Sequence, residues 1–184
     1  PTMIYKKLGS TDINVSVICL GSMTWGSQNT TEEGHAQIDM ALERGVNIID
    51  TAEIYPTTPM SDETQGDTER VIGEWVAKSG RRDDVLIATK VAGDGFRNLR
   101  GGGPITPEII SIAVESSLTA LQTDYIDLYQ VHWPERKSNF FGRLGYEYSE
   151  DMGIKIEETY KAMDQLVKDG KVRYIGISNE TPWG

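Results

Sequence analysis

The sequence predicts an α/β fold, a parallel barrel of the (β/α)₈ type with a short N-terminal hairpin. Segments rich in β-branched and aliphatic residues alternate with segments of helical period, and this order implies parallel strands joined by crossover helices. The predicted loops that follow strands are also much longer than those that follow helices. That asymmetry is typical of a barrel whose functional groups gather at the C-terminal ends of the strands.

The first part of the chain contains the predicted hairpin, one strand and one helix. Residues 4–7, the turn residues Gly9-Ser10 and a second extended segment form the hairpin, and residues 15–20 form the first barrel strand. Thr30-Thr31-Glu32-Glu33 has the pattern of a capping box, in which Thr30 begins the helix and Glu33 reaches back to it. Gly45 ends this helix.

The remaining elements continue the alternation. Aliphatic and β-branched residues dominate four further predicted strands, over residues 46–50, 85–90, 125–132 and 172–178. Helical spacing of apolar residues predicts three further helices, over residues 67–79, 106–121 and 156–167. Thr181-Pro182 has the pattern of another helix start, because Pro fits the first helical position after an N-cap. The long loops are those of residues 21–29, 51–66, 91–105 and 133–153.

Composition bounds the class of protein. Hydrophobic residues make up 38% and charged residues 25% of the chain, which fits one soluble globular domain over residues 1–184. The net charge of −10 opposes binding to nucleic acid or to an anionic membrane. No apolar run approaches the roughly 20 residues of a membrane span.

The few cysteine and histidine residues bear on disulfide bonds, on the cellular compartment and on metal binding. Cys19 is the only cysteine, which excludes an internal disulfide and favours a reducing compartment such as the cytoplasm. His35 lies among polar residues of a predicted helix and is expected to be solvated. No metal site is predicted, because His35 and His132 have no cysteine or carboxylate partners at ligand spacing.

The length is short for the predicted fold. A complete (β/α)₈ barrel usually needs about 250 residues, whereas five barrel strands are predicted in these 184 residues. The sequence therefore predicts about the first five strands of a barrel, apparently truncated after the fifth. Open sheet edges present unpaired backbone groups, so self-association through these edges is expected.

Four polar residues of different chemistry follow or end predicted strands: Asp50, Tyr55, Lys90 and His132. Parallel barrel strands bring these ends to one face, so residues distant in sequence can meet in one pocket. Singly, three of them have a simpler interpretation: Asp50 as a turn cap, Lys90 as a solvated strand end and His132 as a structural histidine. Together, a carboxylate, a phenol, an amine and an imidazole predict proton-transfer chemistry and hence an enzyme.

Several motifs resemble those of the aldo-keto reductase superfamily. In chain order they are Gly21-Ser22-Met23-Thr24-Trp25-Gly26, Asn47-Ile48-Ile49-Asp50-Thr51-Ala52-Glu53-Ile54-Tyr55, Ala88-Thr89-Lys90, Asp127-Leu128-Tyr129-Gln130-Val131-His132-Trp133-Pro134 and Ile175-Gly176-Ile177-Ser178-Asn179. The long loops look closest to the bacterial Tas-type branch. The resemblance covers essentially the whole chain, but only about the first half of a family barrel.

The resemblance implies reduction of a small-molecule aldehyde or ketone with NADP(H) as cofactor. Tyr55 would be the general acid that protonates the carbonyl oxygen. Lys90, paired with Asp50, would lower the pKa of that phenol, since a nearby cation favours the phenolate. His132 would orient and polarise the carbonyl.

The same resemblance implies where cofactor and substrate would lie. Gly21, Ser22 and Met23 would contact the nicotinamide ribose, near Asp50. Ser178 and Asn179 would hold the carboxamide, and Trp25 and Trp133 would wall the substrate pocket. The simpler interpretations are a turn, a helix cap and core packing, respectively.

A second class of function stays open at this point. In the family, contacts to the adenosine phosphate come from the second half of the barrel. The alternative is therefore a catalytically inactive half-barrel, or a regulatory subunit that binds nucleotide without turnover. The intact set of four polar residues favours the enzyme, and NADPH oxidation with 4-nitrobenzaldehyde distinguishes the two.

Overall fold

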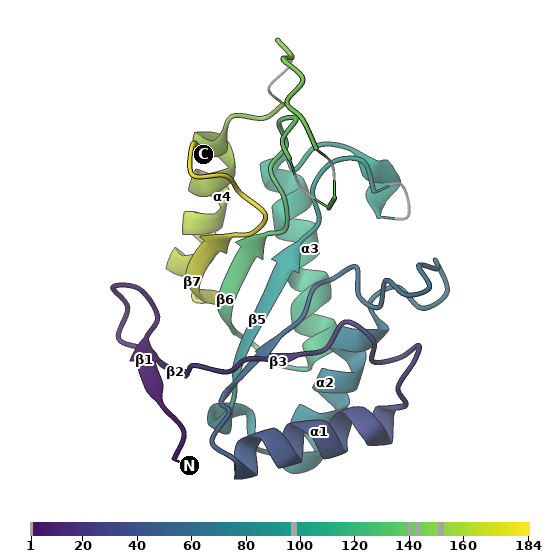
Figure 1. Cartoon of the computed structure of the whole chain (residues 1–184), viewed down its shortest axis with the longest axis vertical. Coiled ribbons are helices and arrows are strands. Elements are labelled where there is room, and N and C mark those ends of the chain that lie inside the picture. Colours follow the sequence, from purple (N-terminus) through teal and green to yellow (C-terminus); the bar gives the residue numbers. More distant parts are fainter. Residues whose placement is uncertain (1, 97–98, 140, 143, 151–152) are drawn as a thin grey trace.

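The computed structural model describes residues 2–96, 99–139, 141–142, 144–150 and 153–184. At its centre five parallel strands lie in the order of the chain: β3 (Leu20–Gly21), β4 (Ile48–Asp50), β5 (Leu86–Val91), β6 (Ile126–Val131) and β7 (Val172–Ile177). The helices are α1 (Thr31–Glu43), α2 (Asp67–Ser79), α3 (Pro107–Leu121) and α4 (Ile156–Lys168). In Figure 1, α3 and α4 cover one side of strands β5, β6 and β7. The alternation of parallel strands and helices agrees with the predicted fold class.

Local signals place the helix ends as predicted. Thr30 accepts a hydrogen bond from the Glu33 backbone nitrogen at 3.2 Å, and the Glu33 carboxylate accepts one from Thr30 N at 3.0 Å. Both halves of the capping box are therefore formed at α1. At α3 the Thr106 hydroxyl accepts from Ile109 N at 3.2 Å, and Gly80 ends α2 in the left-handed region with φ 66°.

The N-terminal strands differ from the prediction. Strand β2 (Asn14–Ser16) pairs antiparallel with β1 (Tyr5–Lys7), so the predicted strand 15–20 is divided and only β3 joins the parallel sheet. The side chain of Asn47 accepts from Ser16 N at 2.8 Å and donates to Asn14 O at 2.9 Å. Because these backbone groups are already bonded, parallel pairing with β4 begins only at Leu20.

Two smaller expectations concern the helices, and the one about His35 is wrong. At the predicted helix start itself, Gly184 N donates to Thr181 O at 3.1 Å in a turn, and the helix after Pro182 stays a prediction. His35 is half-buried rather than solvated, and its Nε2 lies 2.9 Å from Val71 O on α2. It therefore links α1 to α2.

The main core lies between the sheet and the helices. Ile72 of α2, Ile87 of β5, Ile110 of α3 and Ile126 of β6 each have 0% exposure. Full burial of such a side chain stabilises the fold by about 1.5–3 kcal/mol. Successive strand residues point to opposite sides of a sheet, so the register that places Ile87 against the helices turns Lys90 away from them.

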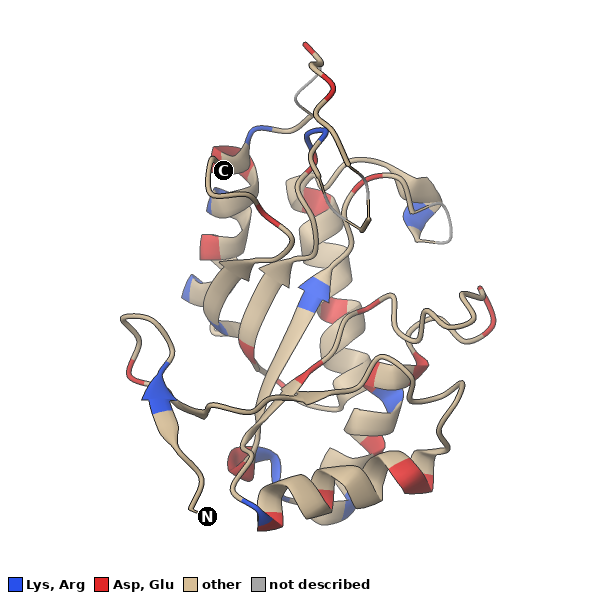
Figure 2. Cartoon of the chain, viewed as in Figure 1, with Lys and Arg blue, Asp and Glu red and all other residues tan. Residues whose placement is uncertain are grey.

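Acidic residues outnumber basic ones, 28 to 18. Figure 2 shows their positions along α1 and α2 and on several loops, consistent with the net charge of −10. Within the described ranges, no helix is long and apolar enough to cross a membrane.

Helices α2 and α3 approach closely at Gly73. A Cβ atom at this position would lie 2.0 Å from Ala120 O and 2.8 Å from the carbonyl carbon of Leu121. Both atoms are backbone, so they cannot move aside without shifting α3. Glycine in a helix interior costs about 0.5–1 kcal/mol relative to alanine, and here the close helix contact explains its presence.

We expect Gly73→Ala to lower the free energy of unfolding by about 1–3 kcal/mol, because overpacking outweighs the gain in helix propensity. Urea denaturation followed by circular dichroism measures the change. The control is Glu74→Ala, on the exposed side of the same helix, which should stay within about 0.5 kcal/mol of the parent. Stabilisation by Gly73→Ala would show that the two helices are not held this close.

Candidate active site

A buried ion pair joins the ends of strands β4 and β5. Lys90 is 5% exposed, and its Nζ donates to both carboxylate oxygens of Asp50 at 2.7 Å and to Thr51 O at 2.8 Å. The parallel pairing places Asp50 opposite Ala88, so Lys90 lies two residues further along and on the same side of the sheet. All three ammonium donors therefore have an acceptor.

Tyr55 lies beside this pair. Lys90 Nζ is 5.2 Å from the centroid of the Tyr55 ring, and the rings of Tyr55 and His132 meet edge to face with centroids 5.7 Å apart. The loop after β4 turns to bring the phenol here, with Tyr55 N donating to Ala52 O at 3.0 Å and Gly66 N to Tyr55 O at 3.0 Å. Asp50, Tyr55, Lys90 and His132 thus converge at one end of the sheet.

The surroundings of Tyr55 change its acidity in the direction opposite to the expectation. Burial raises the pKa of Tyr55 to about 12, and the negative charge of Asp50 adds to the effect. The ammonium of Lys90 faces the ring and is bonded to Asp50 and Thr51. Burial and the Asp50 charge are the causes of the raised pKa of Tyr55, and no lowering by Lys90 accompanies them. The phenol therefore keeps its proton at neutral pH.

His132 is neutral over the same range. It is 3% exposed, and burial, with a smaller effect of the Lys90 charge, lowers the pKa of His132 to about 3. Its Nδ1 is buried and has no hydrogen-bond partner among the described residues. Asn179 holds the backbone at this point, since Asn179 Nδ2 donates to His132 O at 2.9 Å.

A cavity of about 640 Å³ opens at Tyr55 and His132. Apolar and aromatic side chains make up much of its lining, among them Met23, Met60, Phe96, Trp133 and Phe141. The ring centroid of Trp133 lies 6.5 Å from that of Phe96 and 5.5 Å from that of Phe141. Trp133 therefore stands where the sequence predicts a pocket wall.

Trp25 does not line this cavity. It is 1% exposed and packs in the main core, with its indole nitrogen donating to Gln37 Oε1 at 3.1 Å. The room for the ring comes from Gly34 of α1, where a Cβ would lie 3.2 Å from Trp25 Cδ2. Trp25 is therefore a core residue, which was its simpler interpretation, and it does not line the pocket as predicted.

The predicted cofactor residues lie at the same end of the sheet. Gly21 is paired with Asp50, Ser22 is 1% exposed and its hydroxyl donates to Asp50 O at 2.7 Å, and Met23 lines the cavity. Ser178 N donates to Val131 O at 2.9 Å, just beyond the end of β7. These strand ends and the four polar residues therefore form one region.

Two ion pairs in this region, one of them on a buried carboxylate, were not predicted from the sequence. The carboxylate of Glu53, 4% exposed, accepts from both terminal nitrogens of Arg100 at 2.8 and 2.9 Å. Arg136, on the loop after β6, binds the Glu180 carboxylate with both terminal nitrogens. A charged residue between Ala52 and Ile54 is a signal for the first pair, but the sequence does not reveal its partner.

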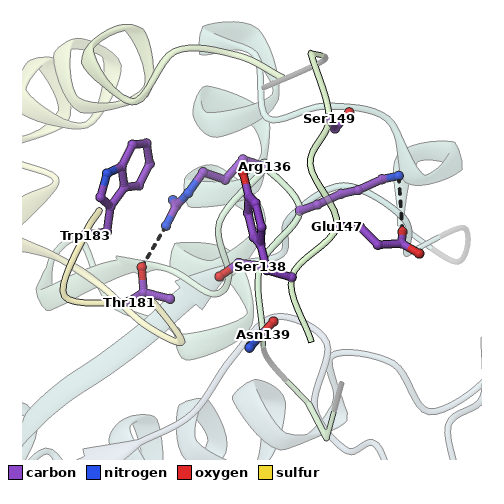
Figure 3. A pocket seen from close by; sticks show the side chains of 9 residues that line it. Arg136, Ser138, Asn139, Glu147, Ser149, Thr181 and Trp183 are labelled. Atoms are coloured by element: carbon purple, nitrogen blue, oxygen red, sulfur yellow. Dashed lines mark hydrogen bonds and ion pairs between the residues drawn. The ribbon is translucent and has the colours of Figure 1, made fainter. Parts of the chain in front are cut away.

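Arg136 connects the loop after β6 to the residues that follow β7. Figure 3 shows its side chain reaching Thr181, with the indole of Trp183 beside it. The guanidinium donates to the Thr181 hydroxyl at 3.1 Å, and its carbon lies 4.9 Å from the Trp183 ring centroid. The described ranges contain no group of three or more His, Cys, Asp or Glu side chains that could hold a metal ion.

Comparison with known proteins places the chain in a family. The model of the Aldo/keto reductase family matches residues 17–184. Protein tas of Escherichia coli K12 is 44% identical over 186 residues, which cover 99% of this chain and 54% of that protein. Aldo-keto reductase YhdN of Bacillus subtilis is 37% identical, over 96% of this chain and 47% of that protein.

A solved structure agrees with these sequences. The aldo-keto reductase AKR11C1 of Bacillus halodurans, in its holo form, superposes with a TM-score of 0.74 at 33% identity, over 98% of this chain and 51% of that one. The predicted barrel class is thereby confirmed, and the chain spans about half the length of the relatives it matches. This chain belongs to the Aldo/keto reductase family.

Proposed function

We propose that this chain supplies the proton-transfer site of an NADPH-dependent reductase that converts aldehydes or ketones to alcohols. The observation that carries the proposal is the convergence of Asp50, Tyr55, Lys90 and His132 at one end of the sheet, where Tyr55 and His132 line a cavity, in a chain of this family. Each of the four has a defined protonation state or partner.

Tyr55 is the group that donates the proton. With a pKa of about 12 it is protonated at neutral pH, and it can release that proton to the oxygen of a carbonyl that is being reduced, since an alkoxide is a stronger base than a phenolate. Lys90 Nζ lies 5.2 Å from the ring centroid, where its bonds to Asp50 and Thr51 fix its position beside the phenol. A positioned acid contributes roughly 10²–10⁴-fold to such a reaction.

His132 orients the substrate. Because its pKa of about 3 leaves it neutral, it can hydrogen-bond to the carbonyl oxygen without adding a charge to the buried site. Its ring contacts those of Tyr55 and Trp133, with centroids 5.7 and 4.9 Å away. These contacts hold the imidazole between the proton donor and the pocket wall.

The described residues fit the nicotinamide end of the cofactor. Asn179 Nδ2 is engaged by His132 O, which leaves the amide oxygen of Asn179 to accept from a carboxamide. Ser178 adds a hydroxyl at the same strand end, and Met23 an apolar surface. When bound, the cofactor supplies the hydride that reduces the carbonyl carbon.

The alternative is a nucleotide-binding half-barrel without turnover. Initial rates of NADPH oxidation with 4-nitrobenzaldehyde test the proposal on two proteins, this chain and the same chain extended with the C-terminal half of Protein tas. Turnover by the extended chain supports the reductase. Nucleotide binding by the extended chain without turnover would support the alternative.

In the extended chain, we expect Tyr55→Phe to lower kcat by about 10²-fold or more, because the proton donor is lost. The Kd for NADPH should change little, since the variant keeps the ring and leaves the other predicted contacts intact. Stopped-flow rates and fluorescence titration of NADPH measure the two quantities. Turnover at the parental rate would mean that another group supplies the proton.

The pH dependence of reduction should be nearly flat from about pH 5 to pH 9. Tyr55 stays protonated below its pKa of about 12, and His132 stays neutral above its pKa of about 3. Neither group therefore titrates in that window. The measurement is kcat/KM for 4-nitrobenzaldehyde across the range, and an inflection near pH 7 would assign the proton transfer to a different group.

The 184-residue chain alone should self-associate and bind NADPH weakly. Its edge strand β7 leaves Ile177 49% exposed, and Ile156 and Tyr160 of the neighbouring α4 are 45% and 58% exposed. Barrels of this kind usually hold phosphate near strands seven and eight, beyond the five parallel strands described here. Light scattering paired with calorimetric titration tests both points, and a monodisperse monomer with micromolar affinity for NADPH would contradict them.

A further inference from the structure

Glu53 is a buried carboxylate two residues before the proposed proton donor. Its side chain is 5% exposed and accepts three hydrogen bonds, from Ala92 N at 2.6 Å and from the two terminal nitrogens of Arg100 at 2.9 and 2.8 Å. A two-pronged bond of this kind fixes the orientation of both partners. Glu53 thereby joins the loop of residues 51–66 to the start and to a later turn of the loop of residues 92–105.

The same residue extends the pairing between β4 and β5. Beyond Asp50, Thr51 N donates to Ala88 O at 2.8 Å and Glu53 N donates to Lys90 O at 3.3 Å. The Glu53 carboxylate then accepts from Ala92 N, in place of a backbone carbonyl. Lys90 is thus held at both ends, its carbonyl by Glu53 and its ammonium by Asp50.

A small cluster of buried apolar side chains lies next to Glu53. Ala52, Ile54, Ala92, Leu99 and Trp133 form a second buried cluster, separate from the main core, and Tyr55 and Phe96 pack against it. The cluster therefore contains both the support of the phenol and part of the cavity wall. Trp133 is tied to the same loop, because its indole nitrogen donates to Asp94 O at 3.1 Å.

The backbone of Arg100 shows that tertiary contacts hold this loop. Arg100 has φ 48°, in the left-handed region that residues other than glycine seldom adopt. A conformation of that kind persists only where its surroundings determine it. The ion pair with Glu53 is the contact that reaches this residue from outside the loop.

We propose that Glu53, held by Arg100, is a positioning residue for carbonyl reduction. It fixes the Tyr55 phenol relative to Lys90 and sets the aromatic wall at Phe96 and Trp133. The proposal rests on the reductase function proposed above. It adds that the geometry of the proton donor depends on an ion pair outside the set of Asp50, Tyr55, Lys90 and His132.

Three variants grade the strength of the connection. Arg100→Lys keeps the positive charge but loses the two-pronged geometry, Arg100→Met removes the charge, and Glu53→Gln keeps an oxygen for Ala92 N. Arg82→Met is the matched control, because it breaks another buried arginine–carboxylate pair, with Asp127, at the opposite end of the strands. The Arg82→Met variant shows which changes in the measurements come from a general loss of stability alone.

The first measurement does not need activity. In the 184-residue chain labelled with ¹³C in its tyrosine rings, the Tyr55 signal is assigned by its loss in Tyr55→Phe. We expect this signal to move in Arg100→Met and Glu53→Gln, to move less in Arg100→Lys, and to stay in Arg82→Met. Hydrogen exchange of amides 92–96 and 99–102 should rise about tenfold or more in Arg100→Met, because a buried charge loses its partner.

The second measurement uses the extended chain. We expect kcat for 4-nitrobenzaldehyde to fall about 10- to 100-fold in Arg100→Met, since small displacements of a reacting group are costly, while the Kd for NADPH is unchanged. Arg100→Lys should recover part of the loss. A parent chain without carbonyl reduction would contradict the reductase function but leave the tyrosine signal as a test of positioning.

Two results would overturn the proposal. In one, the Tyr55 signal and the exchange of residues 92–102 are the same in Arg100→Met as in the parent, which would show that the ion pair positions nothing. In the other, Arg82→Met produces the same changes, which would assign them to loss of overall stability.

Discussion

The ion pair of Lys90 and Asp50 is the interaction on which the candidate site depends. An ammonium that is 5% exposed is costly to bury unless its charge and its three donors are satisfied. Asp50 and Thr51 satisfy all three, and they can do so only because β4 pairs in parallel with β5 in this register. The position of the charged groups in the site is therefore set by the register of β4 and β5 in the sheet.

Burial explains the protonation of the neighbouring Tyr55 and His132. Burial raises the pKa of Tyr55, and the negative charge of Asp50 raises it further. Burial has the opposite effect on the base His132, whose pKa falls. Both groups are thus neutral in the protein at ordinary pH, and the candidate site combines one ion pair with two neutral hydrogen-bonding groups.

Much of this arrangement could be predicted from the sequence. The period of the hydrophobic residues, the capping box at Thr30 and the polar residues at strand ends are local signals, and the structure agrees with them. The division of the first strand was missed because it depends on Asn47, whose side chain binds backbone of residues 14–16. The sign of the Tyr55 shift was missed because it comes from the burial of the phenol and the nearby Asp50 charge, and the extent of that burial is not visible in the sequence.

Trp25 and Glu53 show what local sequence patterns do not reveal. Trp25 was predicted to line the pocket but lies in the core, whereas the buried ion pair of Glu53 was not predicted. A tryptophan beside a predicted strand end has the same local pattern whether it lines a cavity or fills a core, and the space beside Gly34 decides for the core. A glutamate beside a strand end looks solvated until Arg100, 47 residues away, is placed against it. Pairs that form across two long loops leave no signal in the spacing of either one.

In strand β5, residues at the start contribute to the core and to an ion network, and residues near the end belong to the candidate site. At its start, Ile87 lies in the core and its backbone nitrogen donates to Asp127, which also binds Arg82 and Arg173. Towards its end, Lys90 binds Asp50 on one side of the sheet, while Thr89 on the other side donates to the fully buried Glu69 at 2.6 Å. Burial raises the pKa of Glu69 from the ordinary 4.5 to about 7, so the cost of ionising this carboxyl lowers the stability of the fold as the pH rises between those two values and stays constant above them.

Polar groups are therefore buried on both sides of the sheet at the end that carries the candidate site. Each needs a specific partner, and each costs stability when that partner is removed. The opposite end couples a fully bonded ion network to apolar burial, which fits the stabilising role of the N-terminal face in barrels. A site built from buried charges can persist at one end of these strands because the other end and the core between them hold the register.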